Sequence, residues 1–138
     1  MSRGFVKKES ISTLCEEFRK YNYIDPSLNE RYNVKRGLRN ADGTGVLAGL
    51  TQICNVHGYV LNEGEKQPVQ GELTYRGYNI KDLIQGARDG GRYGYEEVSY
   101  LLLFGSLPDQ SQLEFYQMIL SQARSLPQEF IQDMILKA

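Results

Sequence analysis

The stretch that decides the fold is Gly71-Glu-Leu-Thr-Tyr-Arg-Gly-Tyr-Asn-Ile80, just past the middle of a chain of 138 residues. Its first half predicts a short strand, because residues with β propensity lead up to a glycine. Gly77 supplies the backbone freedom that a turn needs, and Arg76 is expected to make a local salt bridge. Asn79 is a good N-cap, so a helix is predicted to follow it directly.

The segments before this stretch predict a small β-hairpin around residues 46–76. Residues 51–61 are rich in β-formers, and their side chains alternate between the two faces of a strand. The polar stretch 62–70 predicts a loop, because it lacks apolar periodicity. Residues 70–75 then form the returning strand.

The remainder of the chain predicts helices. Ser10 is a suitable N-cap for the first helix, and Asp25-Pro26 begins a second, short one. Gly105 directly follows an apolar run and is typical of a helix C-terminus. The apolar run itself has few polar positions, so we expect other elements to cover it from more than one direction. The longer helices are expected over residues 11–22, 79–87, 95–104, 108–124 and from 127 onward.

The bulk composition is that of an ordinary globular chain. Sixteen basic residues balance seventeen acidic ones, so nothing indicates nucleic acid or an anionic membrane as a partner. The longest apolar run, Tyr100–Phe104, is far shorter than the roughly 20 residues of a membrane-spanning helix. The N-terminus lacks a secretory h-region, and the two cysteines have no metal-ligand spacing. The sequence therefore predicts a reduced, cytoplasmic protein without a metal site.

The tightest basic cluster is formed by Lys35, Arg36 and Arg39. Guanidinium groups suit phosphates because they present paired donors in a fixed plane. A solvated loop is the plainer interpretation, and this cluster is the first place to look for a ligand. The nearby Asp42-Gly-Thr-Gly45 is not interpreted as a phosphate loop, because no helix is predicted after it.

Two further motifs favour structural roles. His57 is the only histidine, and no neighbouring residue completes a catalytic pattern with it. Glu96 and Glu97 occupy adjacent helical positions that point about 100° apart, so they do not converge on one proton. In the first turn of a helix they complement its dipole instead.

Three segments carry a family resemblance. They are Gly45-Val-Leu-Ala-Gly-Leu-Thr51, then Gly71 to Leu83, then Tyr95 to Pro108, and a helical region from Leu113 to Ile135 fits with them. In this order and spacing they resemble the N-terminal region of citrate synthases, from about Gly37 to Lys137. The resemblance implies a mainly α fold: a helical, bundle-like N-terminal part of the large domain, over residues 37–138, with the small hairpin inserted. Residues 1–36 are then an N-terminal helical extension.

The resemblance also implies an activity. Citrate synthases work as homodimers and condense acetyl-CoA with oxaloacetate to give citrate and coenzyme A, in the tricarboxylic acid cycle. An aspartate removes a methyl proton while one histidine stabilises the enol and another assists attack on the keto carbonyl. In the family these residues lie C-terminal of the region matched here, so no catalytic residue is assigned, and His57 matches no such motif. This chain alone is expected to be structural, dimer-forming and non-catalytic.

One binding residue follows from the resemblance. Arg39 resembles in position an arginine with which some members contact a phosphate of coenzyme A. Coenzyme A would be part of the substrate, and no separate cofactor is expected. Two alternatives stay open: a 2-methylcitrate synthase, which takes propionyl-CoA, and a free-standing interaction module without catalysis.

Overall fold

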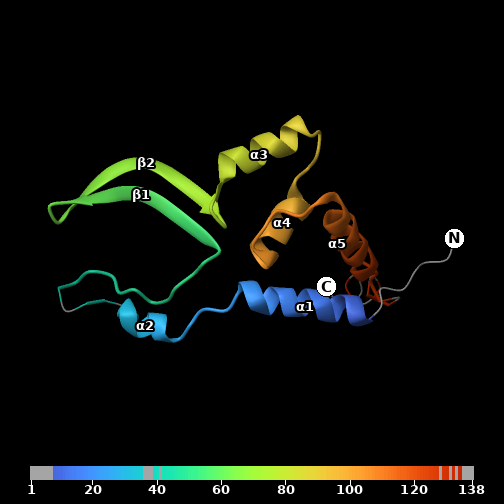
Figure 1. The fold of residues 1–138 in the computed structure, drawn as a ribbon, viewed down its shortest axis with the longest axis horizontal. Coiled ribbons are helices and arrows are strands. Elements are labelled where there is room, and N and C mark those ends of the chain that lie inside the picture. The colour runs from blue at the N-terminus through green and yellow to red at the C-terminus, as the bar shows by residue number, and fades with distance from the viewer. Residues whose placement is uncertain are drawn as a thin grey trace.

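The computed structural model describes residues 8–35, 39–40, 42–127, 129–130, 132 and 134. Within these ranges the chain forms helices and one small antiparallel sheet of order β1-β2-β3 (Figure 1). The hairpin of β1 and β2 extends away from the helices α3, α4 and α5. The helices are α1 (Lys8–Tyr21), α2 (Ser27–Arg31), α3 (Ile80–Asp89), α4 (Tyr95–Phe104) and α5 (Gln110–Ala123).

The returning strand of the hairpin is longer than the sequence predicts. β1 (Cys54–Asn62) pairs with β2 (Glu65–Tyr75), and the short β3 (Tyr78–Asn79) pairs with the end of β2. Glu63 and Gly64 form the turn with φ of 50° and 85°, the two positive values typical of a type I′ hairpin. The predicted loop over residues 62–70 is therefore wrong. Pairing with β1 satisfies the backbone of this polar segment, which propensity alone does not favour as a strand.

The hairpin also begins later than expected. Residues 46–53 lie outside the strands, and in the described residues before them, 39–40 and 42–45, Arg39 and Gly45 form an isolated bridge. Within the hairpin the register shifts between His57 and Tyr59, where Gly58 faces residues 69–71 of β2. The expected mainly α fold is thus confirmed only in part, because the chain mixes helices with an extended sheet.

The core lies around α4, which begins and ends where the sequence predicts. Gly105 ends it with a φ of 83°. The rings of Tyr100 and Phe104 lie 4.5 Å apart, and Tyr116 of α5 meets Tyr100 edge-on at 5.5 Å. Leu14 of α1 packs against this cluster from another side. The expectation that this helix is covered from more than one direction is confirmed.

Helix starts are set by local polar contacts, with one correction. α1 already includes Ser10, so Ser10 is not its N-cap. The Asp25 side chain accepts a hydrogen bond from the Ser27 amide at 2.9 Å, and this bond lowers the pKa of its carboxyl. Asn79 accepts from the Lys81 amide, as predicted. The helix expected from residue 127 lies largely outside the described residues.

The start of α5 is fixed by a capping box rather than by Pro108. The Asp109 side chain accepts from the Gln112 amide at 2.8 Å, and the Gln112 side chain accepts from the Asp109 amide at 2.9 Å. The helix therefore begins at Gln110, two residues after the predicted start.

Candidate functional site

The Arg76 side chain donates hydrogen bonds to segments that are distant in sequence. Its Nη2 donates to the Leu102 carbonyl at 3.0 Å and to Oδ1 of Asn22 at 2.8 Å. Its Nη1 donates to the Tyr21 carbonyl at 3.1 Å. These acceptors sit near the C-terminal ends of α4 and α1, where carbonyls lack helical partners and the helix dipole favours a cation. The guanidinium therefore ties two helix ends to the base of the hairpin.

Asn22 completes this Arg76 junction. Its side-chain nitrogen, Nδ2, donates at 2.8 Å both to the Phe18 carbonyl of α1 and to the Leu103 carbonyl of α4. The Arg76 amide in turn donates to the Ile53 carbonyl at 2.8 Å, just before β1. Four segments that are distant in sequence thus meet around one side chain.

The junction corrects the sequence-based interpretation of Arg76. A local salt bridge was expected, but the partners are backbone carbonyls and one amide oxygen from other segments. The structural role expected for Gly77 is confirmed by its φ of 89°, and Arg76 itself adopts a φ of 49°. Since its donors are already bonded within the chain, Arg76 is placed to hold structure rather than substrate.

Arg39 lies in a separate polar loop. Its Nη1 donates to the Gly43 carbonyl at 2.8 Å, and Asn40 donates to the Gly45 carbonyl at 3.1 Å. Asp42 accepts from the hydroxyl and amide of Thr44 at 2.7 and 3.0 Å, and these bonds lower the pKa of its carboxyl. The hydrogen bond to Gly43 holds the Arg39 guanidinium against its own loop, where it stays exposed to solvent. The predicted phosphate contact of Arg39 stays a prediction.

The rest of the basic cluster is only partly described. The Lys35 amide donates to the Leu47 carbonyl at 3.0 Å, which brings the two ends of the polar loop together. Arg36 lies outside the described residues. No helix follows the turn at residues 42–45 within the described segment 46–53, as the sequence predicts.

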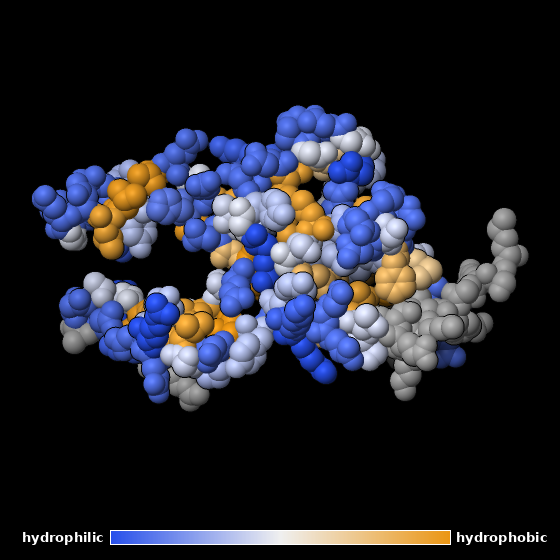
Figure 2. All heavy atoms as spheres, in the orientation of Figure 1, coloured by the Kyte–Doolittle hydropathy of each residue, from blue (hydrophilic) through white to orange (hydrophobic). Residues whose placement is uncertain are grey.

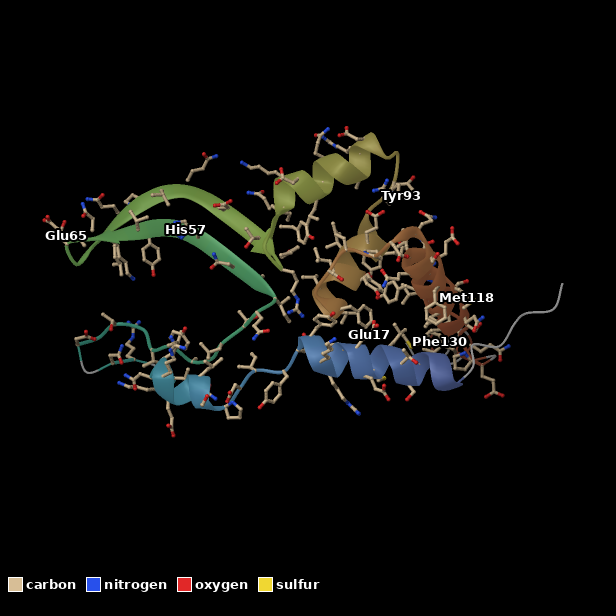
Figure 3. All side chains as sticks on the ribbon, in the orientation of Figure 1. Glu17, His57, Glu65, Tyr93, Met118 and Phe130 are labelled. Carbon is tan, nitrogen blue, oxygen red and sulfur yellow. The ribbon has the colours of Figure 1, made fainter. Side chains whose placement is uncertain are left out.

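His57 and the two glutamates lie on different elements and have different neighbours. His57 is exposed on β1 opposite Glu72, and Figure 3 shows it on the hairpin, well away from Tyr93 in the helical part. Glu97 pairs with Arg92 at 2.5 Å, whereas Glu96 meets Arg124 at 3.5 Å. The two carboxylates diverge toward different partners, as their adjacent helical positions predict.

An apolar groove beside α3 is a feature that the sequence did not predict. It has a volume of about 380 Å³ and lies between the end of β2, α3 and α4. Ile84 is half exposed on it, and Tyr93 stands fully exposed at its rim. Ile80, Leu83 and Ile84 recur at helical spacing and were the available signal. The structure leaves Ile80 and Leu83 partly buried and Ile84 exposed. The lining residues are Tyr75, Ile80, Leu83, Ile84, Ala87, Tyr93, Gly94, Tyr95, Val98, Ser99 and Leu102.

The groove has the chemistry of a packing surface. Its lining holds no charged side chain, so it offers no cation to pair with a carboxylate or phosphate. Figure 2 shows apolar side chains gathered between α3 and α4 on the viewed face. Apolar side chains of another helix or segment are what such a surface can accept.

Within the described ranges, no three His, Cys, Asp or Glu side chains gather in a way that could hold a metal. Cys15 and Cys54 are both free and exposed. The helices of the described part of the chain are all too short or too polar to cross a bilayer.

Comparison with known proteins supports the sequence resemblance. The family model described as "Citrate synthase, C-terminal domain" matches residues 38–138. A citrate synthase of Saccharolobus solfataricus is 38% identical over 104 residues, which is 75% of this chain and 22% of that protein. A 2-methylcitrate synthase of Shewanella oneidensis is 48% identical over 56 residues, which is 41% of this chain and 13% of that protein. No solved structure matches.

The matched part of the chain spans no more than 22% of the length of these two relatives. The geometry reported above, from the Arg76 junction to α5, lies inside the region that the family model matches, apart from the contributions of α1 and Asn22.

Proposed function

This chain belongs to the citrate synthase family, and from that premise we propose that it is the N-terminal part of a citrate synthase. The whole enzyme condenses acetyl-CoA with oxaloacetate to citrate and coenzyme A, as an acyltransferase. The observation that supports this best is the 38% identity to a citrate synthase over 75% of the chain. We further propose that the enzyme is a cytoplasmic homodimer of the tricarboxylic acid cycle.

The role proposed for these residues is that of a scaffold. The Arg76 junction holds α1, α4 and the hairpin base together, and the groove beside α3 offers an apolar surface to further helices of the enzyme. The acid and base groups that the chemistry needs are proposed to lie in the part of the enzyme that follows. Alone, the 138 residues are expected to catalyse nothing.

A second candidate is 2-methylcitrate synthase, which would use propionyl-CoA. The 48% identity to an enzyme of that name over 56 residues favours it, and a second such enzyme, from Corynebacterium glutamicum, is 34% identical over 93 residues. The pocket that chooses between the two acyl groups is proposed to lie outside this chain.

The test begins with the intact mass of the protein from its native source. A mass several times 15.8 kDa is expected. That protein should release free thiol from acetyl-CoA only when oxaloacetate is added, whereas the 138-residue chain should release none. Faster turnover with propionyl-CoA would favour the second candidate. A native mass near 15.8 kDa with no thiol release would overturn both and favour an interaction module.

Arg39 is proposed to contact a phosphate of coenzyme A in the whole enzyme. Arg39→Ala should then raise the KM for acetyl-CoA several-fold, on the order of one lost charged hydrogen bond, with kcat little changed. Asn40→Ala is the matched control, because it removes a bond of the same loop and keeps the guanidinium. An equal rise in KM for both variants would mean that Arg39 acts only by closing its loop.

A further inference from the structure

Arg39 belongs to an arm, residues 23–51, that projects from the rest of the chain. The arm leaves the end of α1, passes through α2 and returns to the start of β1 (Figure 1). The structure describes residues 23–35, 39–40 and 42–51 of it, and none of these is buried. Within these ranges no hydrogen bond or ion pair joins the arm to a helix or strand outside it. Its direction is therefore set at its two ends.

Arg76 binds both ends of the arm. At the outgoing end, Nη1 donates to the Tyr21 carbonyl at 3.1 Å and Nη2 donates to Oδ1 of Asn22 at 2.8 Å. At the returning end, Nη1 donates to the Gln52 carbonyl at 3.5 Å, and the Arg76 amide donates to the Ile53 carbonyl at 2.8 Å. The donors of a guanidinium have fixed directions in one plane, so these bonds orient the two ends relative to each other.

Two further ties join the outgoing and returning halves of the arm. The Lys35 amide donates to the Leu47 carbonyl at 3.0 Å. Farther out, Arg39 and Gly45 form the isolated antiparallel bridge. The two halves are thus tied together near Arg76, at Lys35 and at Arg39. A change in the direction of the arm at Arg76 should therefore move Arg39 as well.

We propose that Arg76 is a positioning residue for binding of the coenzyme A thioester, and that it acts through Arg39. The proposal rests on the phosphate contact proposed for Arg39. The Arg76 donors are bonded to the ends of the arm and to α4, so Arg76 does not touch the substrate. It holds Arg39 at the place where the phosphate contact is made. A displacement of about 1 Å in a group that contacts the substrate is enough to impair an enzyme strongly.

Steady-state kinetics of the whole enzyme test this role. Arg76→Ala should raise the KM for acetyl-CoA several-fold, and it should leave kcat and the KM for oxaloacetate within about twofold of the wild type. Asp109→Ala is the matched control. It removes the cap of α5 and so also destabilises the fold, but it leaves both ends of the arm intact. Its KM for acetyl-CoA should equal that of the wild type.

A double variant shows whether Arg76 acts through Arg39. Arg39→Ala combined with Arg76→Ala should have the KM of Arg39→Ala alone, because no phosphate contact is left to position. Independent effects would multiply instead. Asn22→Ala replaces Arg76→Ala if that variant folds poorly. It removes one bond at the outgoing end and keeps the guanidinium, so the KM for acetyl-CoA should rise by a smaller factor.

Distances between two spin labels test the direction of the arm in the absence of substrate. In a background with Cys15→Ser and Cys54→Ser, the labels are attached at Asn29→Cys in α2 and at Arg88→Cys in α3, both exposed positions. The distance distribution should be narrow when Arg76 is present and broader in Arg76→Ala. The control variant of the kinetic experiment should keep the narrow distribution. This measurement requires no enzymatic activity, so its result does not depend on the proposed reaction.

Three results would overturn the positioning role alone. One is a distance distribution in Arg76→Ala as narrow as in the wild type. Another is an Arg76→Ala enzyme whose KM for acetyl-CoA is unchanged, or whose loss falls equally on both substrates and on kcat. The third is a double variant whose rise in KM is the product of the two single effects. An unchanged KM in Arg39→Ala would instead contradict the coenzyme A contact itself, and this role of Arg76 with it.

Discussion

The Arg76 junction and the outer part of the hairpin are built from opposite kinds of contact. At the junction, side chains and carbonyls from α1, α4 and the hairpin base meet, although they are separated by up to 81 positions in sequence. In the outer hairpin, β1 and β2 contact each other, and every side chain of β1 is exposed. The helical part is held by long-range contacts, whereas the hairpin tip is held mainly by its own local pairing.

This difference suggests which residues stabilise the fold and which are available for contacts with other molecules. Residues that bring distant segments together should dominate the free energy of unfolding, because their loss removes packing that nothing nearby replaces. Exposed residues of the hairpin should contribute little to it, and their role is better sought in contacts with another chain. The predictions below test this division, from the largest expected effect to the smallest.

Leu101→Ala should give the largest loss of stability. Leu101 is fully buried in α4, so truncation leaves a cavity and should lower the free energy of unfolding by about 3 kcal/mol. Leu103→Ala on the same helix is the matched control, because 37% of that residue is exposed. Its loss should be about 1 kcal/mol. Urea denaturation measures both, and equal losses would show that the buried side of α4 contributes no more to stability than its partly exposed side.

Arg76→Ala should follow, with a loss of about 2 kcal/mol. The substitution removes charged donors and leaves the Leu102 and Tyr21 carbonyls without them. Arg88→Ala in the last turn of α3 is the matched control, and we expect a change within about 0.5 kcal/mol because that side chain is exposed. If Arg76→Ala lowered the free energy of unfolding no more than Arg88→Ala, the Arg76 junction would not stabilise the fold.

Tyr100 should produce a smaller, pH-dependent effect. Burial first, and then the charges of Glu17 and Asp109, raise the pKa of its hydroxyl above the ordinary 10.0. The folded state therefore keeps the proton at a pH where the unfolded state has lost it. This contribution to stability is present below about pH 10 and declines as the pH rises through the folded pKa.

Tyr100→Phe should accordingly reduce the fall in unfolding free energy between about pH 9 and pH 11. Urea denaturation at the two pH values gives the slope. Tyr93→Phe, at a fully exposed ring, is the control and should keep the wild-type slope. A steeper fall in Tyr100→Phe than in the wild type would contradict the sign of the argument.

Val56→Ala should have the smallest effect on stability. Val56 keeps 77% of its surface, so its truncation should change the free energy of unfolding by no more than about 0.5 kcal/mol. Thermal denaturation at low protein concentration, which disfavours association, measures the change in folding stability. A loss as large as that of Leu101→Ala would mean that the hairpin belongs to the core.

The sequence predicts the helices of this molecule better than its hairpin. The run from Tyr95 to Phe104, followed by Gly105, marks α4 because a helix of mostly apolar residues and a glycine stop are both local signals. The outer half of β2 has no such signal. Its polar residues become a strand because β1 lies beside them, and the turn at Glu63-Gly64 shows only a glycine in the sequence.

In the candidate site too, the sequence predicts the local features and misses the long-range contacts. Asn79 as a cap and Gly77 as a turn residue follow from their immediate neighbours. The partners of Arg76 do not, because they are mostly backbone carbonyls, which every residue carries and which no sequence pattern marks. The groove was missed for a related reason: the stripe on α3 predicts an apolar face without saying whether a neighbour covers it.

Native-state hydrogen exchange on the dilute protein tests the central division most directly. The account predicts that amides of Leu101 and Phe104 exchange only through global unfolding, with the largest protection in the chain. Amides of Tyr59 to Leu61 should exchange through local opening of the hairpin, at a lower free energy. Outer-hairpin amides as strongly protected as those of α4 would contradict the account.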